Sequence, residues 1–205
     1  MKTLIFDCSL PLEREMPRVC AAMRAGALAL LPTDTVYGLC ACACDEHAIA
    51  RIIALKGRPD GKPLPLFVHS MDEAKQLVRW PPQAEKLARA FWPGALTLVL
   101  KTRPGAPLAP AYAKTAGIRV PNHDFLLRWL KLCRLPLAQT SANVSGQPAA
   151  RSAKDAIALF YGKVDFIFAG GDAPGTESTV ADLTGPSPRI LREGAIREPE
   201  LRGKL

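Results

Sequence analysis

The sequence predicts a single α/β domain built on a mixed β-sheet. Short apolar runs of strand length alternate along the chain with amphipathic segments of helix length, which is the pattern of an α/β protein. The 205 residues are enough for one domain with a substantial core. Hydrophobic residues make up 48% of the chain and charged residues 22%, as in an ordinary globular protein.

The first three elements are expected within the first 31 residues. Residues 2–6 and 27–31 are apolar runs of the length of short strands. Between them, residues 17–25 have the pattern of a helix. Pro17 can open this helix because proline suits the first turn, and Gly26 can end it.

The next helix is expected at residues 46–56. Asp45 is suited to cap its N-terminus, and its apolar residues recur at helical spacing: Ala48, Ile49, Ile52 and Ile53. A strand is expected at residues 64–68. Pro65 favours an edge position for this strand because proline has no N–H to donate to a neighbouring strand.

The same alternation continues to the C-terminus. Helices are expected at 71–79, 82–91, 123–132 and 153–161, and strands at 96–100, 117–120, 135–139, 165–168, 178–183 and 189–192. The loop 102–116 is rich in proline, alanine and glycine, and we expect an active-site flap there rather than a domain boundary. Because no repeat or linker interrupts the pattern, residues 1–205 are expected to form one domain.

The chain is basic, with a net charge of +8 and a pI near 9.4, which favours an anionic partner such as a nucleotide, a nucleic acid or an acidic lipid. The N-terminal apolar run Leu4–Phe6 is too short for a secretion signal. No charge-free stretch reaches the roughly 18 residues that a membrane span needs. We therefore expect a cytoplasmic protein with no membrane partner.

Three of the six cysteines, Cys40, Cys42 and Cys44, alternate with alanine. Zinc sites usually separate their thiols by two to four residues and need a second group of ligands. Neither condition is met here, and buried free cysteines are common. We therefore expect no dedicated metal site.

Several standard catalytic motifs are absent from the sequence. It contains neither of the glycine-rich phosphate-binding motifs, G-x-x-x-x-G-K-[ST] and G-x-G-x-x-G, and no G-x-S-x-G nucleophile motif. Only three histidines are present, so an enzyme with a Ser-His or Cys-His pair is poorly supported.

The segment LKGRPDGKPL at residues 55–64 places Lys56, Arg58 and Lys62 on a loop shaped by glycine and proline. The first two cations could simply complement the carbonyl end of helix 46–56. That explanation accounts neither for Lys62 nor for the glycines and prolines. A triphosphate, which needs both forked arginine donors and lysine charges, accounts for all of them.

Small polar residues follow two of the expected strands, in PTDTVYGL (32–39) and QTSANVSG (139–146). Polar groups at strand ends often form ligand sites in open α/β sheets. The alternative is a pair of turns closed by their own hydroxyl and amide side chains. Three further segments combine polar residues with a strand or a turn: TAGIRVPNH (115–123), GGDAPGTEST (170–179) and ILREG (190–194).

Five of these segments together resemble the YrdC-like domain of threonylcarbamoyl-AMP synthases. They are PTDTVYGL, K-x-R at 56–58 followed by KPL, S-x-N at 141–143, ESTVADL and ILREGA. They occur in the family's order from about residue 15 to 196. The resemblance implies an open, twisted mixed sheet flanked by helices, with a basic concave cavity. This YrdC-like fold is similar to that of a double-stranded-RNA-binding protein.

The resemblance also implies a reaction. Family members form L-threonylcarbamoyl-adenylate and pyrophosphate from L-threonine, bicarbonate and ATP. Partner proteins of tRNA modification then transfer the threonylcarbamoyl group to adenosine 37 of tRNA. ATP is a substrate accompanied by Mg²⁺, and no protein carboxylate cage for the metal is evident in the sequence.

By the same resemblance, functional residues are carried over position by position. The catalytic set is Lys56, Arg58, Ser141 and Asn143; ATP would lie near Arg58, Lys62, Thr115, Ser141 and Arg192; threonine would lie near Thr33, His69, Arg119 and Ser178. Lys56 and Arg58 would stabilise phosphate charge, and Arg119 would bind the threonine carboxylate.

Two alternatives remain open from the sequence. The first is a non-catalytic module that binds tRNA or double-stranded RNA, which suits the positive charge but lacks an aromatic stacking platform. The second is a sister YrdC-like protein of less certain activity. Intact K-x-R and S-x-N pairs favour the synthase.

Overall fold

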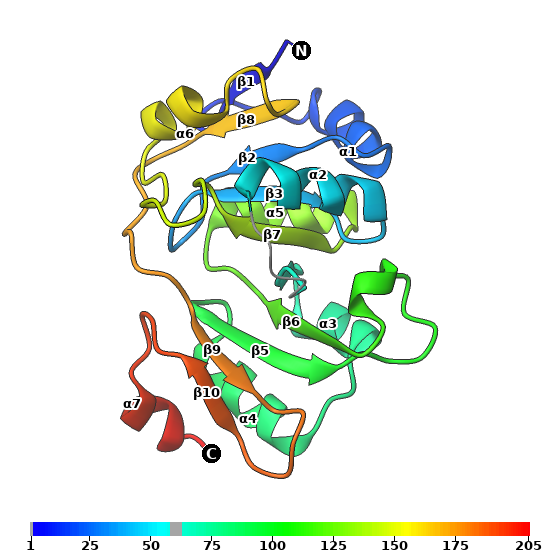
Figure 1. Cartoon of the computed structure of the whole chain (residues 1–205), viewed down its shortest axis with the longest axis vertical. Helices are drawn as coiled ribbons and strands as arrows, with labels where there is room; N and C mark the ends of the chain where they lie inside the picture. The colour runs from blue at the N-terminus through cyan, green and yellow to red at the C-terminus, as the bar shows by residue number, and fades with distance from the viewer. Residues whose placement is uncertain (1, 58–62) are drawn as a thin grey trace.

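In the computed structural model, which describes residues 2–57 and 63–205, ten strands form one mixed sheet (Figure 1). The order across the sheet is β1-β8-β2-β3-β7-β4-β6-β5-β9-β10. The strands are β1 (Leu4–Asp7), β2 (Ala29–Leu31), β3 (Gly38–Cys42), β4 (Leu66–Phe67), β5 (Leu96–Lys101), β6 (Thr115–Arg119), β7 (Leu137–Ser141), β8 (Phe166–Ala169), β9 (Thr179–Asp182) and β10 (Arg189–Arg192). Parallel and antiparallel pairs are both present, so the predicted α/β class with a mixed sheet is confirmed.

The helices also match the expected pattern, with one additional α-helix near the C-terminus. They are α1 (Met16–Arg24), α2 (Glu46–Lys56), α3 (Met71–Leu77), α4 (Pro82–Phe91), α5 (Asp124–Cys133), α6 (Ala153–Phe160) and α7 (Glu198–Arg202). The sequence did not predict β3 or α7. It also did not predict the short 3₁₀ turn Pro110–Tyr112, which lies within the expected flap. Tyr112 is fully buried there, so this part of the loop is anchored to the core.

The ends of α2 are set by local chemistry. The Asp45 side chain accepts hydrogen bonds from the backbone N–H groups of His47 and Ala48, at 2.9 and 3.1 Å. Gly57 ends the helix in the left-handed conformation, with φ of 60°, which glycine adopts without strain. Lys56 is therefore the last residue of the helix.

Two hydrophobic cores join the helices to the sheet. In the first, α1 and α5 pack against the sheet around the buried Trp129. The second contains the apolar faces of α2, α3, α4 and α6. Alternate residues of β2 serve the two cores, since Ala29 and Leu31 belong to the first and Leu30 to the second.

The expectation that residues 64–68 form an edge strand is wrong. β4 lies inside the sheet, antiparallel to β7 and parallel to β6. Only Leu66 and Phe67 form the strand, so Pro65 precedes it and its missing N–H breaks no ladder bond. The carbonyl of Pro65 still accepts a hydrogen bond from Gln139 N at 2.8 Å.

The three alternating cysteines separate in the fold. Cys40 and Cys42 lie in β3 and are buried, whereas Cys44 lies beyond the strand and its thiol donates to the carbonyl of Pro107 at 2.6 Å. Only Cys40 and Cys42 therefore share a strand face.

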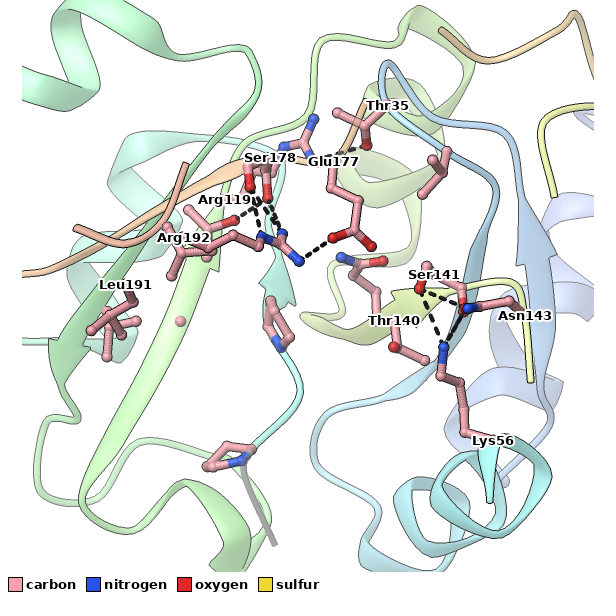
Figure 2. A pocket seen from close by; sticks show the side chains of 18 of the residues that line it. Thr35, Lys56, Arg119, Thr140, Ser141, Asn143, Glu177, Ser178, Leu191 and Arg192 are labelled. Carbon is pink, nitrogen blue, oxygen red and sulfur yellow. Dashed lines mark hydrogen bonds and ion pairs between the residues drawn. The ribbon is translucent and has the colours of Figure 1, made fainter. Parts of the chain in front are cut away.

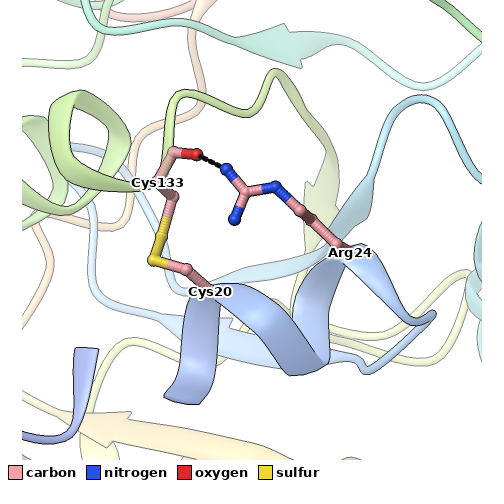
Figure 3. Close-up of a disulfide and its surroundings, with 3 residues drawn as sticks. All are labelled: Cys20, Arg24 and Cys133. Atoms are coloured by element: carbon pink, nitrogen blue, oxygen red, sulfur yellow. Dashed lines mark hydrogen bonds between the residues drawn. A yellow bond between two sulfur atoms is a disulfide. The ribbon is translucent and has the colours of Figure 1, made fainter. Parts of the chain in front are cut away.

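A disulfide joins Cys20 of α1 to Cys133 of α5, two helices that share a core (Figure 3). The two cysteines are 113 residues apart in the sequence, and no motif connects them. Arg24 adds a second link between the helices by donating to the carbonyl of Cys133. Disulfides are uncommon under the reducing conditions of the cytoplasm. The bonded pair therefore does not agree with the expected cytoplasmic location.

Loss of this disulfide is expected to lower the free energy of unfolding by about 2–5 kcal/mol, because the bond restricts the unfolded chain across a long loop. Urea unfolding of the protein with and without reductant measures the effect. A Cys133→Ser variant is the control, because its unfolding midpoint should not respond to reductant. Equal midpoints for the oxidised and reduced wild type would contradict the expectation.

Candidate active site

A cavity of about 790 Å³ lies on the sheet beside the ends of β6 and β7 (Figure 2). Strand alternation forms much of its wall. In β6, Thr115, Gly117 and Arg119 line the cavity, while Ala116 and Ile118 point into the core. The other lining residues that carry polar side chains are Thr35, Lys56, Thr97, Gln139, Thr140, Ser141, Asn143, Ser145, Glu177, Ser178 and Arg192.

One side of the cavity is formed by Lys56, Ser141 and Asn143. The Nζ of Lys56 donates to the Ser141 carbonyl at 2.8 Å, to Ser141 Oγ at 3.2 Å and to Asn143 Oδ1. Ser141 Oγ also donates to Asn143 Oδ1 at 2.7 Å. Lys56 is only 5% exposed. Its ammonium group therefore binds the last residue of β7 and the loop that follows, and complementing the carbonyl end of α2 does not explain its position.

Arg119 lies on the opposite side of the cavity and is 1% exposed. Its Nε donates to the Gly94 carbonyl at 2.8 Å, Nη1 to Thr35 Oγ1 at 3.1 Å, and Nη2 to Asp34 Oδ1 at 2.6 Å. Burial lowers the pKa of Arg119, and the nearby Arg192 lowers it further, while Asp34 opposes both effects. The ion pair with Asp34 thus compensates a buried positive charge.

Arg192 of β10 lies beside Arg119 and is held by the segment before β9. Its Nε and Nη2 both donate to the carbonyl of Ser178, at 3.2 and 2.9 Å. Its Nη1 forms an ion pair with Glu177. Ser178 is 5% exposed, and its hydroxyl lies 3.0 Å from the hydroxyl of Thr97.

The cavity is basic. Among its described lining residues are three cations, Lys56, Arg119 and Arg192, and one carboxylate, Glu177. Cations that line a concave surface raise the local concentration of anions and favour binding of polyanions such as nucleotides. In the described part of the chain, no three His, Cys, Asp or Glu side chains are grouped in a way that could hold a metal ion.

The structure brings together most of the residues selected from the sequence. Those that line the cavity are Lys56, Thr115, Arg119, Ser141, Asn143, Ser178 and Arg192. Arg58 and Lys62 lie outside the described residues.

Two of the selected residues are not among those that line the cavity. The Oγ1 of Thr33 is buried in its own turn, where it accepts from Thr35 N at 3.0 Å and donates to the Val36 carbonyl at 2.7 Å. This is the turn that the sequence left open as an alternative. His69 lines a different surface hollow, with its Nδ1 2.6 Å from Glu73 Oε2.

Sequence reasoning did not select Asp34, Thr35 or Glu177, which bond to the two arginines of the site. Other polar residues that line the cavity and were not selected are Thr97, Gln139, Thr140 and Ser145. Asp34 follows the selected Thr33 in PTDT, Thr35 comes one residue later, and Glu177 precedes the selected Ser178 in TEST. The available signal was charge balance, because a buried arginine such as Arg119 requires a carboxylate partner. The sequence did not indicate which of the acidic residues would supply it.

Comparison with known proteins supports this reading of the fold. A family model named Sua5_yciO_yrdC, described as telomere recombination, matches residues 21–194. A threonylcarbamoyl-AMP synthase of Pyrococcus abyssi is 40% identical over 203 residues, which cover 97% of this chain and 60% of that protein. A putative threonylcarbamoyl-AMP synthase of Mycobacterium leprae is 40% identical over 199 residues, covering 94% of this chain and 89% of that protein.

Solved structures agree with the sequence matches. The crystal structure of P. abyssi Sua5 complexed with L-threonine has a TM-score of 0.91 and 37% identity, over 99% of this chain and 61% of that one. The structure of E. coli YciO has a TM-score of 0.86 and 26% identity, over 98% of this chain and 100% of that one. None of the helices in the described residues is long and apolar enough to cross a membrane. By its sequence, its fold and the match across residues 21–194, the chain belongs to the Sua5/YciO/YrdC family.

Proposed function

We propose that this protein forms threonylcarbamoyl-AMP and pyrophosphate from L-threonine, bicarbonate and ATP. The observation that carries the proposal is the single cavity that joins the Lys56, Ser141 and Asn143 group to the Arg119 and Arg192 group. The chain spans 60% of the length of the P. abyssi synthase and 89% of the length of the M. leprae relative.

The proposed reaction requires positioning more than covalent catalysis. Threonine and bicarbonate give a carbamate, whose oxygen attacks the α-phosphorus of ATP as pyrophosphate leaves. The enzyme must hold the reactants in line and stabilise charge that develops on the phosphate oxygens. This agrees with a cavity of arginines, a lysine and hydroxyl groups.

Lys56 and Arg192 would bind phosphate groups of ATP, with Ser141 and Asn143 orienting the nucleotide or the carbamate. Arg119 would bind the threonine carboxylate. Its bonds to described residues use three of the five guanidinium N–H groups, and the others can face a ligand. Arg58, Lys62 and Thr115 remain proposed ATP contacts.

Mg²⁺ would arrive with ATP. The described cavity residues supply a single carboxylate, which does not fit a protein cage for this ion, since Mg²⁺ prefers several oxygen ligands. Its chemistry would be to neutralise phosphate charge.

The product would pass to tRNA-modification proteins that act on adenosine 37. The cytoplasmic location of the protein remains a prediction.

Purified protein incubated with ATP, Mg²⁺ and bicarbonate tests the proposal. Pyrophosphate release is expected to depend on L-threonine and to be much weaker with L-serine. Tight ATP binding without turnover would favour the sister branch of less certain activity. Binding of RNA but not of ATP, with an affinity that falls steeply with salt, would favour the RNA-binding alternative.

A further inference from the structure

Glu177 is the one carboxylate among the described residues that line the cavity. Its side chain is 43% exposed, and it immediately precedes Ser178. In Figure 2 its carboxylate points toward Arg192, in the space between the arginines and the Ser141 group. A carboxylate among cations that are proposed to bind an anionic substrate would repel that substrate. Its position therefore requires a specific explanation.

The bond between Glu177 and Arg192 is not what positions Arg192. Two of the arginine nitrogens, Nε and Nη2, are held by the carbonyl of Ser178. Only Nη1 is used by Glu177. A phosphate that binds Nη1 therefore competes with Glu177 and releases its carboxylate into the cavity, while the guanidinium keeps its place.

The proposed reaction needs a base that removes a proton from the ammonium group of threonine. Threonine carries an ammonium group at neutral pH, and its nitrogen can attack bicarbonate only after losing a proton. Among the described residues that line the cavity, the charged groups besides Glu177 are Arg192 of β10, Arg119 of β6 and Lys56 of α2, and cations are poor bases. Asp34 is held 2.6 Å from Arg119, with 13% of its side chain exposed.

We propose that Glu177 binds the ammonium group of threonine and removes its proton, an inference that rests on the proposed function. The N–H bond breaks, the proton passes to Glu177, and the nitrogen keeps the electron pair. The nitrogen then forms a bond to the bicarbonate carbon, and the carbon–hydroxyl bond breaks. A second nitrogen proton leaves with that hydroxyl as water, and Glu177 returns its proton to the solvent.

Binding of ATP and activation of threonine are coupled in this arrangement. Phosphate takes the Nη1 position on Arg192, and the carboxylate that it displaces becomes available to the amine. The carbamate thus forms when ATP, the adenylyl donor that it attacks, is already bound.

The test compares Glu177→Gln with the wild type in threonine-dependent pyrophosphate release. At neutral pH, kcat/KM for threonine is expected to fall about 100-fold, the lower range for loss of a general base. The loss should shrink as pH rises, because solvent then deprotonates the amine. Calorimetry with ATP should show affinity equal to or higher than that of the wild type, because the competing charge is gone.

Three controls separate the possible outcomes. Glu193→Gln removes a carboxylate that pairs with Arg197 and is not among the cavity residues, so it should behave as the wild type. Glu177→Asp keeps the carboxylate and should restore the wild-type pH profile in part, which also decides the case if Glu177→Gln does not fold. Reduced ATP affinity in Glu177→Gln, with a loss of activity that does not depend on pH, would mean that Glu177 only supports Arg192 and would overturn the proposal. An inactive wild type would instead refute the proposed function.

Discussion

Replacement of Lys56 by methionine is expected to lower the turnover of adenylate formation by about 100- to 1,000-fold, the cost of removing one preorganised donor from a charged transition state. The Nζ of Lys56 links the end of α2 to Ser141, the last residue of β7, and to Asn143 in the loop that follows. Methionine keeps most of the length of the side chain but removes the charge. Pyrophosphate release at saturating ATP and threonine measures the loss.

The fold is expected to survive this change. The bonds that Lys56 makes to Ser141 and Asn143 face the cavity, where water can replace the ammonium group. Lys163→Met is a matched control. Lys163 is exposed, and its Nζ donates only to the carbonyl of Leu159, four residues earlier in the chain, among the hydrogen bonds of the described residues. A Lys56→Met protein that is unfolded, or one with full activity, would contradict the assignment.

Replacement of Arg119 by methionine is expected to have two separate effects. Threonine binding should fall strongly because the proposed carboxylate contact is lost. The free energy of unfolding should also fall, by about 3–5 kcal/mol, because Asp34 is left as a largely buried charge without its partner. Calorimetry with threonine and urea unfolding measure the two effects.

A second substitution separates binding from stability. In the double variant Arg119→Met with Asp34→Asn, the unpaired charge is gone, so most of the lost stability should return. Threonine binding should not return. Recovery of threonine binding in the double variant would show that Arg119 acts only by neutralising Asp34, and the proposed contact with substrate would then be wrong.

The parts of the fold that follow local rules were predictable from the sequence. Helix 46–56 was placed correctly because Asp45 marks its start and its apolar residues have helical spacing. The edge position of residues 64–68 was predicted wrongly, because a rule for proline within a strand was applied to one that precedes it. Strand order is set by packing between distant segments, which local patterns do not encode.

The candidate site was also predictable only in part. Motif resemblance identified Lys56, Ser141 and Asn143 as a group, and the structure brings them together. It could not identify the pairs formed by Asp34 and by Glu177, because each joins residues from different elements. The disulfide between Cys20 and Cys133 was equally hidden, since the helices that carry these residues are adjacent only in the folded chain.

The most direct test of the central claim is the fate of labelled bicarbonate. Protein incubated with ¹³C-bicarbonate, ATP, Mg²⁺ and L-threonine is expected to yield a nucleotide product whose mass corresponds to threonylcarbamoyl-AMP with one ¹³C. Its formation should require threonine and should be lost in Lys56→Met. A wild-type protein that binds ATP and threonine but never transfers the label to an adenylate would contradict the account.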